Sequence, residues 1–139
     1  MVCVIVREEV FTKKYIYVTI NMEVDIMEHI LKLQPRYFDY INEGTKRVEL
    51  RLYDEKRQQI NIGDTIIFQK EPELETTMKV KVIGLLRYNS FEELFNDFRI
   101  EIMADKSMTK QELLNVLEEF YTPEKQKQYG VVGIRIEKI

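Results

Sequence analysis

The stretch Gly44-Thr45-Lys46-Arg47-Val48-Glu49-Leu50-Arg51 carries the strongest structural signal in the chain. Aliphatic and charged residues alternate through it, which predicts a strand over residues 45–53 with one charged face. Side chains two residues apart share a face, so we expect Arg47, Glu49 and Arg51 together, with Lys46 at the strand entrance. Such a group could hold a phosphate or a nucleobase, although ion pairs on a solvent-facing strand would give the same pattern.

The sequence on both sides of this strand predicts further strands and one short helix. Residues 29–33 alternate as a half-buried strand does, and Pro35 then opens a helix over 35–43 that Gly44 ends. Downstream, a polar loop or helical turn (54–59) and a tight turn (60–64) precede two strands, 65–69 and 78–88, which a loop (70–77) separates. Gly84 marks a bulge or a close contact in the second of them.

Two helix starts are encoded after the strand at 78–88. Ser90 and Glu93 form the pattern of a capping box before a helix over 91–98, and Thr109 and Glu112 do the same for the next helix. The apolar stripe expected to be buried on that second helix consists of Leu113, Val116, Leu117 and Phe120. Pro123 is expected to open only a short turn, and residues 131–139 form a final strand.

The predicted order is strand, helix, three strands, two helices and strand. Most of these strands lack a crossover helix, which favours an α+β fold with a mixed, barrel-like sheet over a doubly wound fold. Residues 10–20 are rich in β-branched and aromatic residues and read either as a strand or as part of a dispensable extension. We therefore divide the chain into an N-terminal extension or extra strand, 1–27, and a domain, 28–139.

Composition restricts the classes of function. The chain has 139 residues, 45% of them hydrophobic, and a net charge of -3, which indicates one soluble domain. That charge argues against a generally polycationic nucleic-acid binder but permits a local basic pocket. A single Cys (Cys3) and a single His (His29) exclude a disulfide framework and a zinc site of Cys and His alone. We expect a cytoplasmic protein without a membrane span, a metal or a cofactor.

The charged strand resembles a known signature. Gly44, Lys46, Glu49 and Arg51 match the G-x-K-x-x-E-x-R pattern of the ASCH domain, part of the PUA-like superfamily. The resemblance continues in order through Ile62-Gly63-Asp64, residues 86–94 and residues 129–134, and so covers about residues 28–139. It implies a PUA-like mixed β-barrel with helices packed around it and a cleft beside the signature strand.

The resemblance also implies a ligand, which is RNA or a nucleotide-like small molecule. By the match, Lys46, Glu49 and Arg51 would bind it: the two cations would take phosphate or a carbonyl, and Glu49 would fix donors on a base. Further candidates, for charge and stacking, are Arg87, Tyr88 and Tyr129, for which ordinary packing is the alternative. The oligomeric state stays open.

Catalysis is a second possibility. Some bacterial members of this family are amidohydrolases that act on N4-acetylcytidine through a Lys, a Thr three residues later and a more distant Glu. Here Lys46 is present, Glu49 holds the Thr position and the distant acid falls near Lys106, so two of the three residue types are absent. A ribonuclease would need an acid/base pair such as Lys46 and Glu49.

Two weaker hypotheses rest on charge alone. A metal-dependent nuclease could use acidic pairs such as those at 54–55 or 92–93, but carboxylates at a helix start already explain the second pair. In a protein-interaction module, the charged strand would be ordinary surface.

Overall fold

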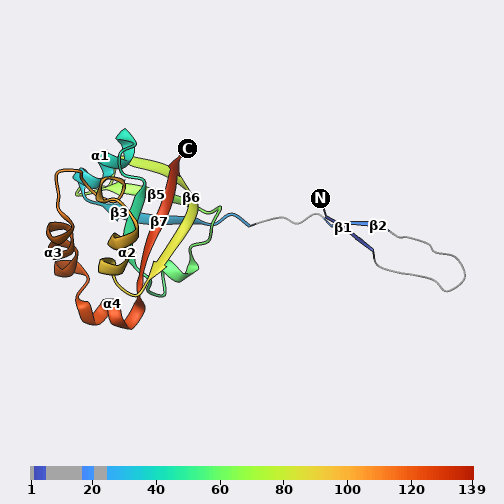
Figure 1. Ribbon diagram of the computed structural model, residues 1–139. Helices are drawn as coiled ribbons and strands as arrows, with labels where there is room; N and C mark the ends of the chain where they lie inside the picture. Colours follow the sequence, from blue (N-terminus) through green and yellow to red (C-terminus); the bar gives the residue numbers. More distant parts are fainter. Residues whose placement is uncertain (1, 6–16, 21–24) are drawn as a thin grey trace, which may run out of the picture.

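The computed structural model describes residues 2–5, 17–20 and 25–139. Strands β1 (Val2–Ile5) and β2 (Tyr17–Ile20) pair antiparallel in a two-stranded sheet of their own (Figure 1). β2 covers the end of the segment expected as a strand over 10–20, and the earlier part of that segment lies outside the described residues. The environment of the Cys3 side chain also lies outside the described part, and the division of the chain after residue 27 stays a prediction.

Five strands form the main sheet. They are β3 (Glu28–Leu33), β4 (Val48–Leu52), β5 (Thr65–Lys70), β6 (Thr77–Tyr88) and β7 (Val131–Lys138). Their order is β3-β5-β6-β7-β4, with β3 parallel to β5 and every other pair antiparallel, so the mixed sheet and the α+β class are confirmed. The register shifts between Val82 and Gly84, where a Cβ would lie 3.1 Å from the Arg135 side chain, and this confirms both features expected at Gly84.

The sheet curls into a half-barrel, which agrees with the barrel-like sheet expected from the sequence, but the barrel is not fully closed. β3 and β4 are the edge strands, and no ladder joins them in the described part of the chain. Helix α1 (Pro35–Glu43) connects these two edges (Figure 1) and ends as expected at Gly44, whose φ of 87° lies in the left-handed region. The open seam between β3 and β4 is therefore the place where side chains can reach between the edges.

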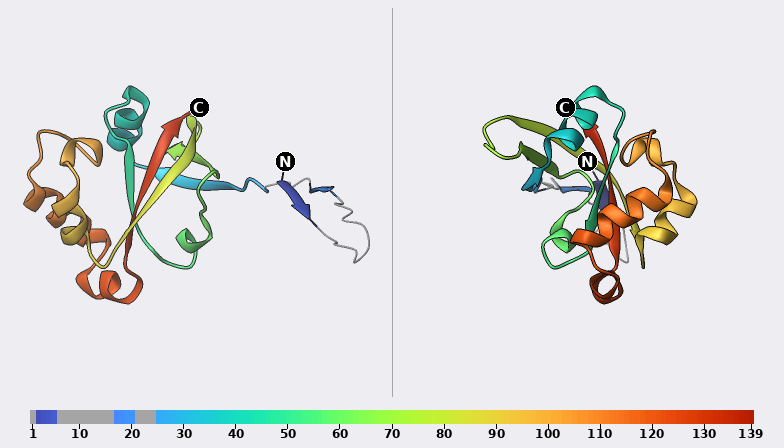
Figure 2. Two further views of the ribbon diagram at one scale, coloured as in Figure 1. Left: turned by 45° about the vertical axis from the view of Figure 1, so that its right-hand side comes forward. Right: turned by 90° about the vertical axis from the view of Figure 1, so that its left-hand side faces the viewer.

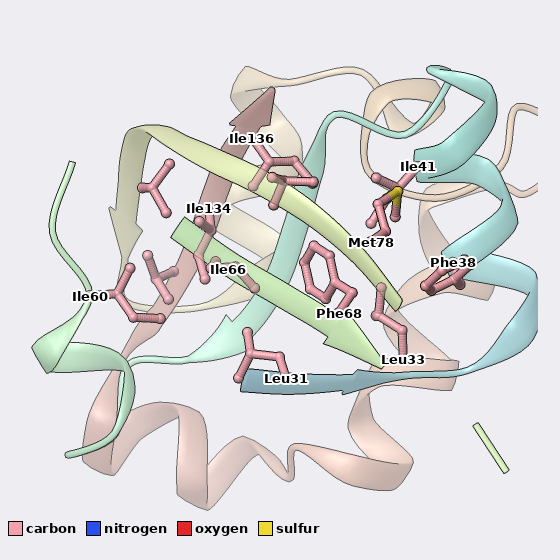
Figure 3. Close-up of a cluster of buried hydrophobic side chains, with 13 residues drawn as sticks. Leu31, Leu33, Phe38, Ile41, Ile60, Ile66, Phe68, Met78, Ile134 and Ile136 are labelled. Carbon is pink, nitrogen blue, oxygen red and sulfur yellow. The ribbon is translucent and has the colours of Figure 1, made fainter. Parts of the chain in front are cut away.

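The larger core lies inside the curl of the sheet. Alternate residues of β5 and β6 point inward, and Ile66, Phe68 and Val80 have no solvent-exposed surface. Side chains from β3, α1 and β7 meet them there (Figure 3). Burial of each such side chain contributes about 1.5–3 kcal/mol, so the half-barrel is held by its interior and not by closure of the seam.

A helical layer covers the other face of the sheet (Figure 2). It contains α2 (Phe91–Asp97), α3 (Lys110–Phe120) and α4 (Pro123–Tyr129). The 3-10 turn η2 (Ile100–Ile102) lies between α2 and α3. A second 3-10 turn, η1 (Arg57–Gln59), follows β4. Thr109 forms the expected capping box with Glu112, and the Ser90 side chain accepts from the backbone N–H of Glu93. These caps fix where α2 and α3 begin.

Two expectations about this layer were wrong. Residues 123–129 form a helix and not a turn, because Pro123 stands at its first position and the Thr122 side chain caps it by accepting from Lys125 N–H. Phe120 is 55% exposed, and within the stripe expected to be buried only Leu113 is fully so. The rest of that stripe lines a cleft, and of these residues only Leu117 also packs against the core.

Candidate functional site: a cleft at the open seam

A cleft of about 220 Å³ lies at the seam between the two edge strands. Lys32 and Leu33 of β3 line one side, and Glu49 and Arg51 of β4 line the other. In a closed barrel, hydrogen bonds between the edges would bring neighbouring strands to about 4.8 Å and leave no such space. The cleft therefore follows directly from the incomplete barrel.

Lys46 is buried beside this cleft, with 3% of its surface exposed. Its Nζ donates to Val48 O at 2.6 Å and to Met103 O, and it pairs with Glu49 Oε1 at 3.3 Å. Burial lowers the pKa of the ammonium, and Glu49 opposes that effect. The three acceptors match the three N–H groups of a protonated lysine, so this side chain has no donor left for a ligand.

Glu49 is also buried, and its two oxygens are both occupied. Oε1 accepts from Leu50 N–H at 3.0 Å in addition to Lys46, and Oε2 accepts from Arg51 Nε at 3.3 Å and Nη2 at 3.0 Å. Burial alone would raise the pKa of the carboxyl group, but the two cations outweigh it, and the pKa lies below its ordinary value. Glu49 is therefore an ionised carboxylate that holds Arg51 in place.

Arg51 reaches across the seam. Its Nη2 donates to Lys32 O of β3 at 2.7 Å as well as to Glu49. The two N–H groups of Nη1 donate to no group in the described part of the chain, and Nη1 is not among its buried unpartnered atoms. The free hydrogen-bonding capacity of the signature residues thus lies on one edge of one guanidinium group.

Arg47 does not join this group. It lies before β4, its side chain is exposed, and its backbone N–H donates to Ile102 O at 2.7 Å. The expectation that Arg47, Glu49 and Arg51 share a charged strand face is therefore corrected. Glu49 and Arg51 lie opposite Ile134 and Val132 of β7, whose side chains belong to the core inside the curl. The face that they share is the concave one.

The remaining wall of the cleft is apolar and aromatic. It is formed by the α3 stripe Leu113, Val116, Leu117 and Phe120, together with Met103, Tyr37 and Tyr121. The hydroxyl groups of Tyr37 and Tyr121 have no hydrogen-bond partner in the described part of the chain, and burial raises the pKa of both. Both hydroxyls are therefore protonated at neutral pH and can donate.

Sequence reasoning missed these aromatic residues and one acidic residue, Glu71. The α3 stripe could have signalled the wall, because an amphipathic helix also lines clefts, but it was assigned to the core. Glu71 follows β5, and its backbone N–H donates to Leu33 O at 2.8 Å, which fixes it beside β3. Its carboxylate forms no ion pair with another described residue, and no pattern in the sequence identifies it.

The other three candidate residues lie elsewhere. Arg87, Tyr88 and Tyr129 line a second hollow of about 460 Å³ at the end of β4, β6 and β7. The Tyr88 hydroxyl donates to the Asp97 carboxylate, so it is already occupied. The six sequence-predicted site residues therefore form two groups, with Lys46, Glu49 and Arg51 in the seam cleft.

The residue set of the amidohydrolase members is not assembled in the seam cleft. Lys46 and Glu49 are bound to each other, and Lys106, at the position of the distant acid, is exposed and does not line the cleft. Residues 2–5, 17–20 and 25–139 contain no group of three or more His, Cys, Asp or Glu side chains placed to hold a metal ion. In the same part of the chain, no helix has the length and apolar character needed to cross a membrane.

Comparison with known families identifies the domain. The family model described as "ASCH domain" matches residues 31–139, which include the seam cleft. The chain belongs to the ASCH domain family. The resemblance found in the signature strand is thereby confirmed, and this ASCH domain keeps all four signature residues, Gly44, Lys46, Glu49 and Arg51.

Two solved structures resemble this ASCH domain closely. The crystal structure of hypothetical protein PH0355 matches with 42% sequence identity and a TM-score of 0.73, over 81% of this chain and 100% of that one. The solution NMR structure of protein PF0455 from Pyrococcus furiosus matches with 36% identity and a TM-score of 0.65, over 81% of this chain and 98% of that one. None of the curated proteins matches the chain.

Proposed function

We propose that this ASCH domain binds RNA or a nucleotide-like ligand and places one nucleobase in the seam cleft. The observation that carries the proposal is the free Nη1 edge of Arg51 in a cleft with apolar and aromatic walls. A guanidinium edge donates to carbonyl or ring-nitrogen acceptors, and aromatic walls stack on any base. Both kinds of contact are available within one cavity.

The three signature residues divide this work. Lys46 keeps Glu49 ionised, and Glu49 accepts from Nε and Nη2 along one edge of the Arg51 guanidinium group. These contacts fix the plane of the fork before a ligand arrives, which lowers the entropy lost on binding. Lys46 and Glu49 are therefore positioning residues, in place of the direct ligand contacts expected from the sequence.

The size and polarity of the cleft favour a base over a phosphate. Its volume of about 220 Å³ is smaller than pockets for drug-sized ligands, which measure about 300–1,000 Å³. The side chains of Arg51, Tyr37 and Tyr121 offer donors, and the Glu71 carboxylate offers an acceptor. A nucleobase carries acceptors and N–H donors on one edge and matches this mixture, whereas a second anion beside Glu71 does not.

Titration of the four common ribonucleosides and of a short single-stranded RNA tests this function. Arg51→Gln should weaken binding of the preferred nucleoside and of the RNA by about tenfold or more, because it removes a charge-assisted donor. Arg99→Gln is the matched control, because Arg99 is exposed and does not line the cleft. Equal affinities for wild type and Arg51→Gln would refute the site.

A second variant guards against loss of folding, because Arg51 also bridges the seam. Val116→Phe adds bulk to the wall of the cleft and leaves Lys46, Glu49 and Arg51 unchanged. Leu114→Phe makes the same kind of change on α3 outside the lining of the cleft. Nucleoside binding should fall in the first variant only, and unimpaired binding by folded Val116→Phe would place the ligand elsewhere.

A further inference from the structure

The second hollow, lined by Tyr53, Arg87, Lys127, Tyr129 and neighbouring residues, has no role in the function proposed above. Arg87 and Lys127 are both exposed and face it from β6 and α4. Glu93 also lines the hollow, yet neither cation forms an ion pair or a side-chain hydrogen bond with any described residue. Two cations with free donors thus share one concave surface.

Arg87 is held in a defined position without using its donors. Its guanidinium carbon lies 4.0 Å from the centre of the Tyr53 ring, in a cation–π contact. Stacking of this kind restrains the plane of the guanidinium group and leaves the N–H groups at its edges free. A planar fork with free edges is the group that binds phosphate oxygens best.

Gly130 is one of the residues that line the hollow. Its φ is 71°, and a Cβ at this position would be 3.1 Å from Tyr88 O. A larger residue at this position would therefore strain the backbone beside the hollow. Tyr129, which precedes Gly130, is half-buried against the helical layer and keeps an edge in the hollow.

The sheet register relates the position of Arg87 to that of Arg51. Arg51 of β4 and Arg87 of β6 are both directly opposite Val132 of β7. Directly opposite residues point to the same face of a sheet, and two strand spacings separate their Cα atoms by about 10 Å. Tyr53, which supports Arg87, lies two residues beyond Arg51 in the chain. Arg51 and Arg87 therefore project from the same face of the sheet, with the buried Val132 between them.

We infer that the hollow between Arg87, Tyr53 and Lys127 is a phosphate-binding subsite for the same ligand that the seam cleft binds. This inference rests on the function proposed above, and it makes the ligand a polynucleotide chain that places a base in the seam cleft and a backbone phosphate at Arg87. The chain carries a net charge of -3, so its attraction for a polyanion must come from such local pairs of cations.

Binding of three probes to the full chain tests the subsite: uridine, inorganic phosphate and a six-nucleotide uridine RNA. The double variant Arg87→Gln/Lys127→Gln is compared with Arg99→Gln/Lys81→Gln, which makes the same change in net charge at exposed positions outside both sites. The first variant should bind the RNA about tenfold more weakly, with uridine binding unchanged. The slope of log affinity against log salt concentration should be smaller in magnitude by about 0.7.

A Tyr53 series separates positioning from charge. Tyr53→Phe keeps the ring under Arg87 and should leave RNA affinity and its salt slope unchanged. Tyr53→Leu removes the ring but no charge, and should weaken RNA binding about threefold with uridine binding intact. RNA affinity that is the same in both variants would overturn the role assigned to the Arg87–Tyr53 stack.

The outcomes distinguish this inference from the function on which it rests. RNA affinity and salt slope that are the same in the two double variants, or no RNA binding by wild type, would overturn the subsite. If inorganic phosphate binds as tightly as the RNA, the inference that the ligand is a polynucleotide is overturned, and the hollow is a site for a free anion. A third outcome would refute the base site alone. In it, Arg51→Gln changes the affinity for neither uridine nor RNA, while Arg87→Gln/Lys127→Gln still weakens RNA binding.

Discussion

Lys46→Met is the most informative single change, because Lys46 joins three parts of the site. Its ammonium contacts Glu49, the backbone of β4 at Val48 and the segment after η2 at Met103. Methionine fills a similar volume without the charge. The change therefore leaves a buried carboxylate and two backbone carbonyls without this donor, and it creates little cavity.

The expected loss can be worked from those contacts. Removal of one partner from a buried ion pair costs about 3–5 kcal/mol, because the other charge is left in a poorly solvated place. Glu49 keeps two hydrogen bonds from Arg51, which favours the lower half of that range, about 3–4 kcal/mol. Domains of this size have a free energy of unfolding of about 5–15 kcal/mol, so the variant should still fold but should unfold at a lower urea concentration than wild type.

Urea denaturation at pH 7 measures this loss. With a slope of about 2 kcal/mol per molar urea, the midpoint of Lys46→Met should fall by about 2 M. The matched control Lys106→Met, at an exposed position, should change the free energy of unfolding by less than about 0.5 kcal/mol.

A double variant tests whether the effect comes from the ion pair. Lys46→Met/Glu49→Gln should be less destabilised than the sum of the two single changes by about 1–2 kcal/mol, because the carboxylate that Lys46→Met leaves without its ammonium partner is then neutral. A midpoint shift below about 0.5 M for Lys46→Met, or strict additivity in the double variant, would refute the reasoning.

Two further predictions concern acid stability and the end of α1. Since the pKa of Glu49 is lowered in the folded protein, its contribution is complete above the ordinary pKa of about 4.3 and is lost as the pH falls through the lower folded value. Urea midpoints at pH 7, 5, 4 and 3 should therefore decline less steeply below pH 4.3 in Glu49→Gln than in wild type; parallel curves would contradict this. Gly44→Ala should lower the free energy of unfolding by about 1–2 kcal/mol, because residue 44 has a positive φ. The added Cβ should not clash, because nothing lies within 4 Å of it. Gly44→Asn should cost less in the same urea assay, and an alanine variant as stable as wild type would show that the turn relaxes freely.

Local signals explain why most elements were predictable. Gly44, Ser90 and Thr109 mark the end or start of a helix through hydrogen bonds within a few residues. Alternation in the strands is local too. Residues 123–129 show the limit, because a seven-residue polar helix has little apolar periodicity and only the Thr122–Pro123 start distinguishes it from a turn.

The site was predictable in part for the same reason. The residue types at 46, 49 and 51 stand in the sequence, and their spacing already suggests that they meet. What each of them binds depends on groups remote in sequence: Lys46 donates to Met103 and Arg51 donates to Lys32. Those contacts change Lys46 and Glu49 from expected ligand contacts into supports for Arg51.

The sequence by itself determined the α+β class, the signature strand and the family, because alternation, caps and the spacing of four residues are properties of neighbours in the chain. Only the tertiary structure decided that the barrel stays open between β3 and β4. It also decided that Arg87 lies in a second hollow opposite the same residue of β7 as Arg51. The physical reason is that closure of a sheet and convergence of charges depend on pairing between strands far apart in the chain, which no local pattern specifies.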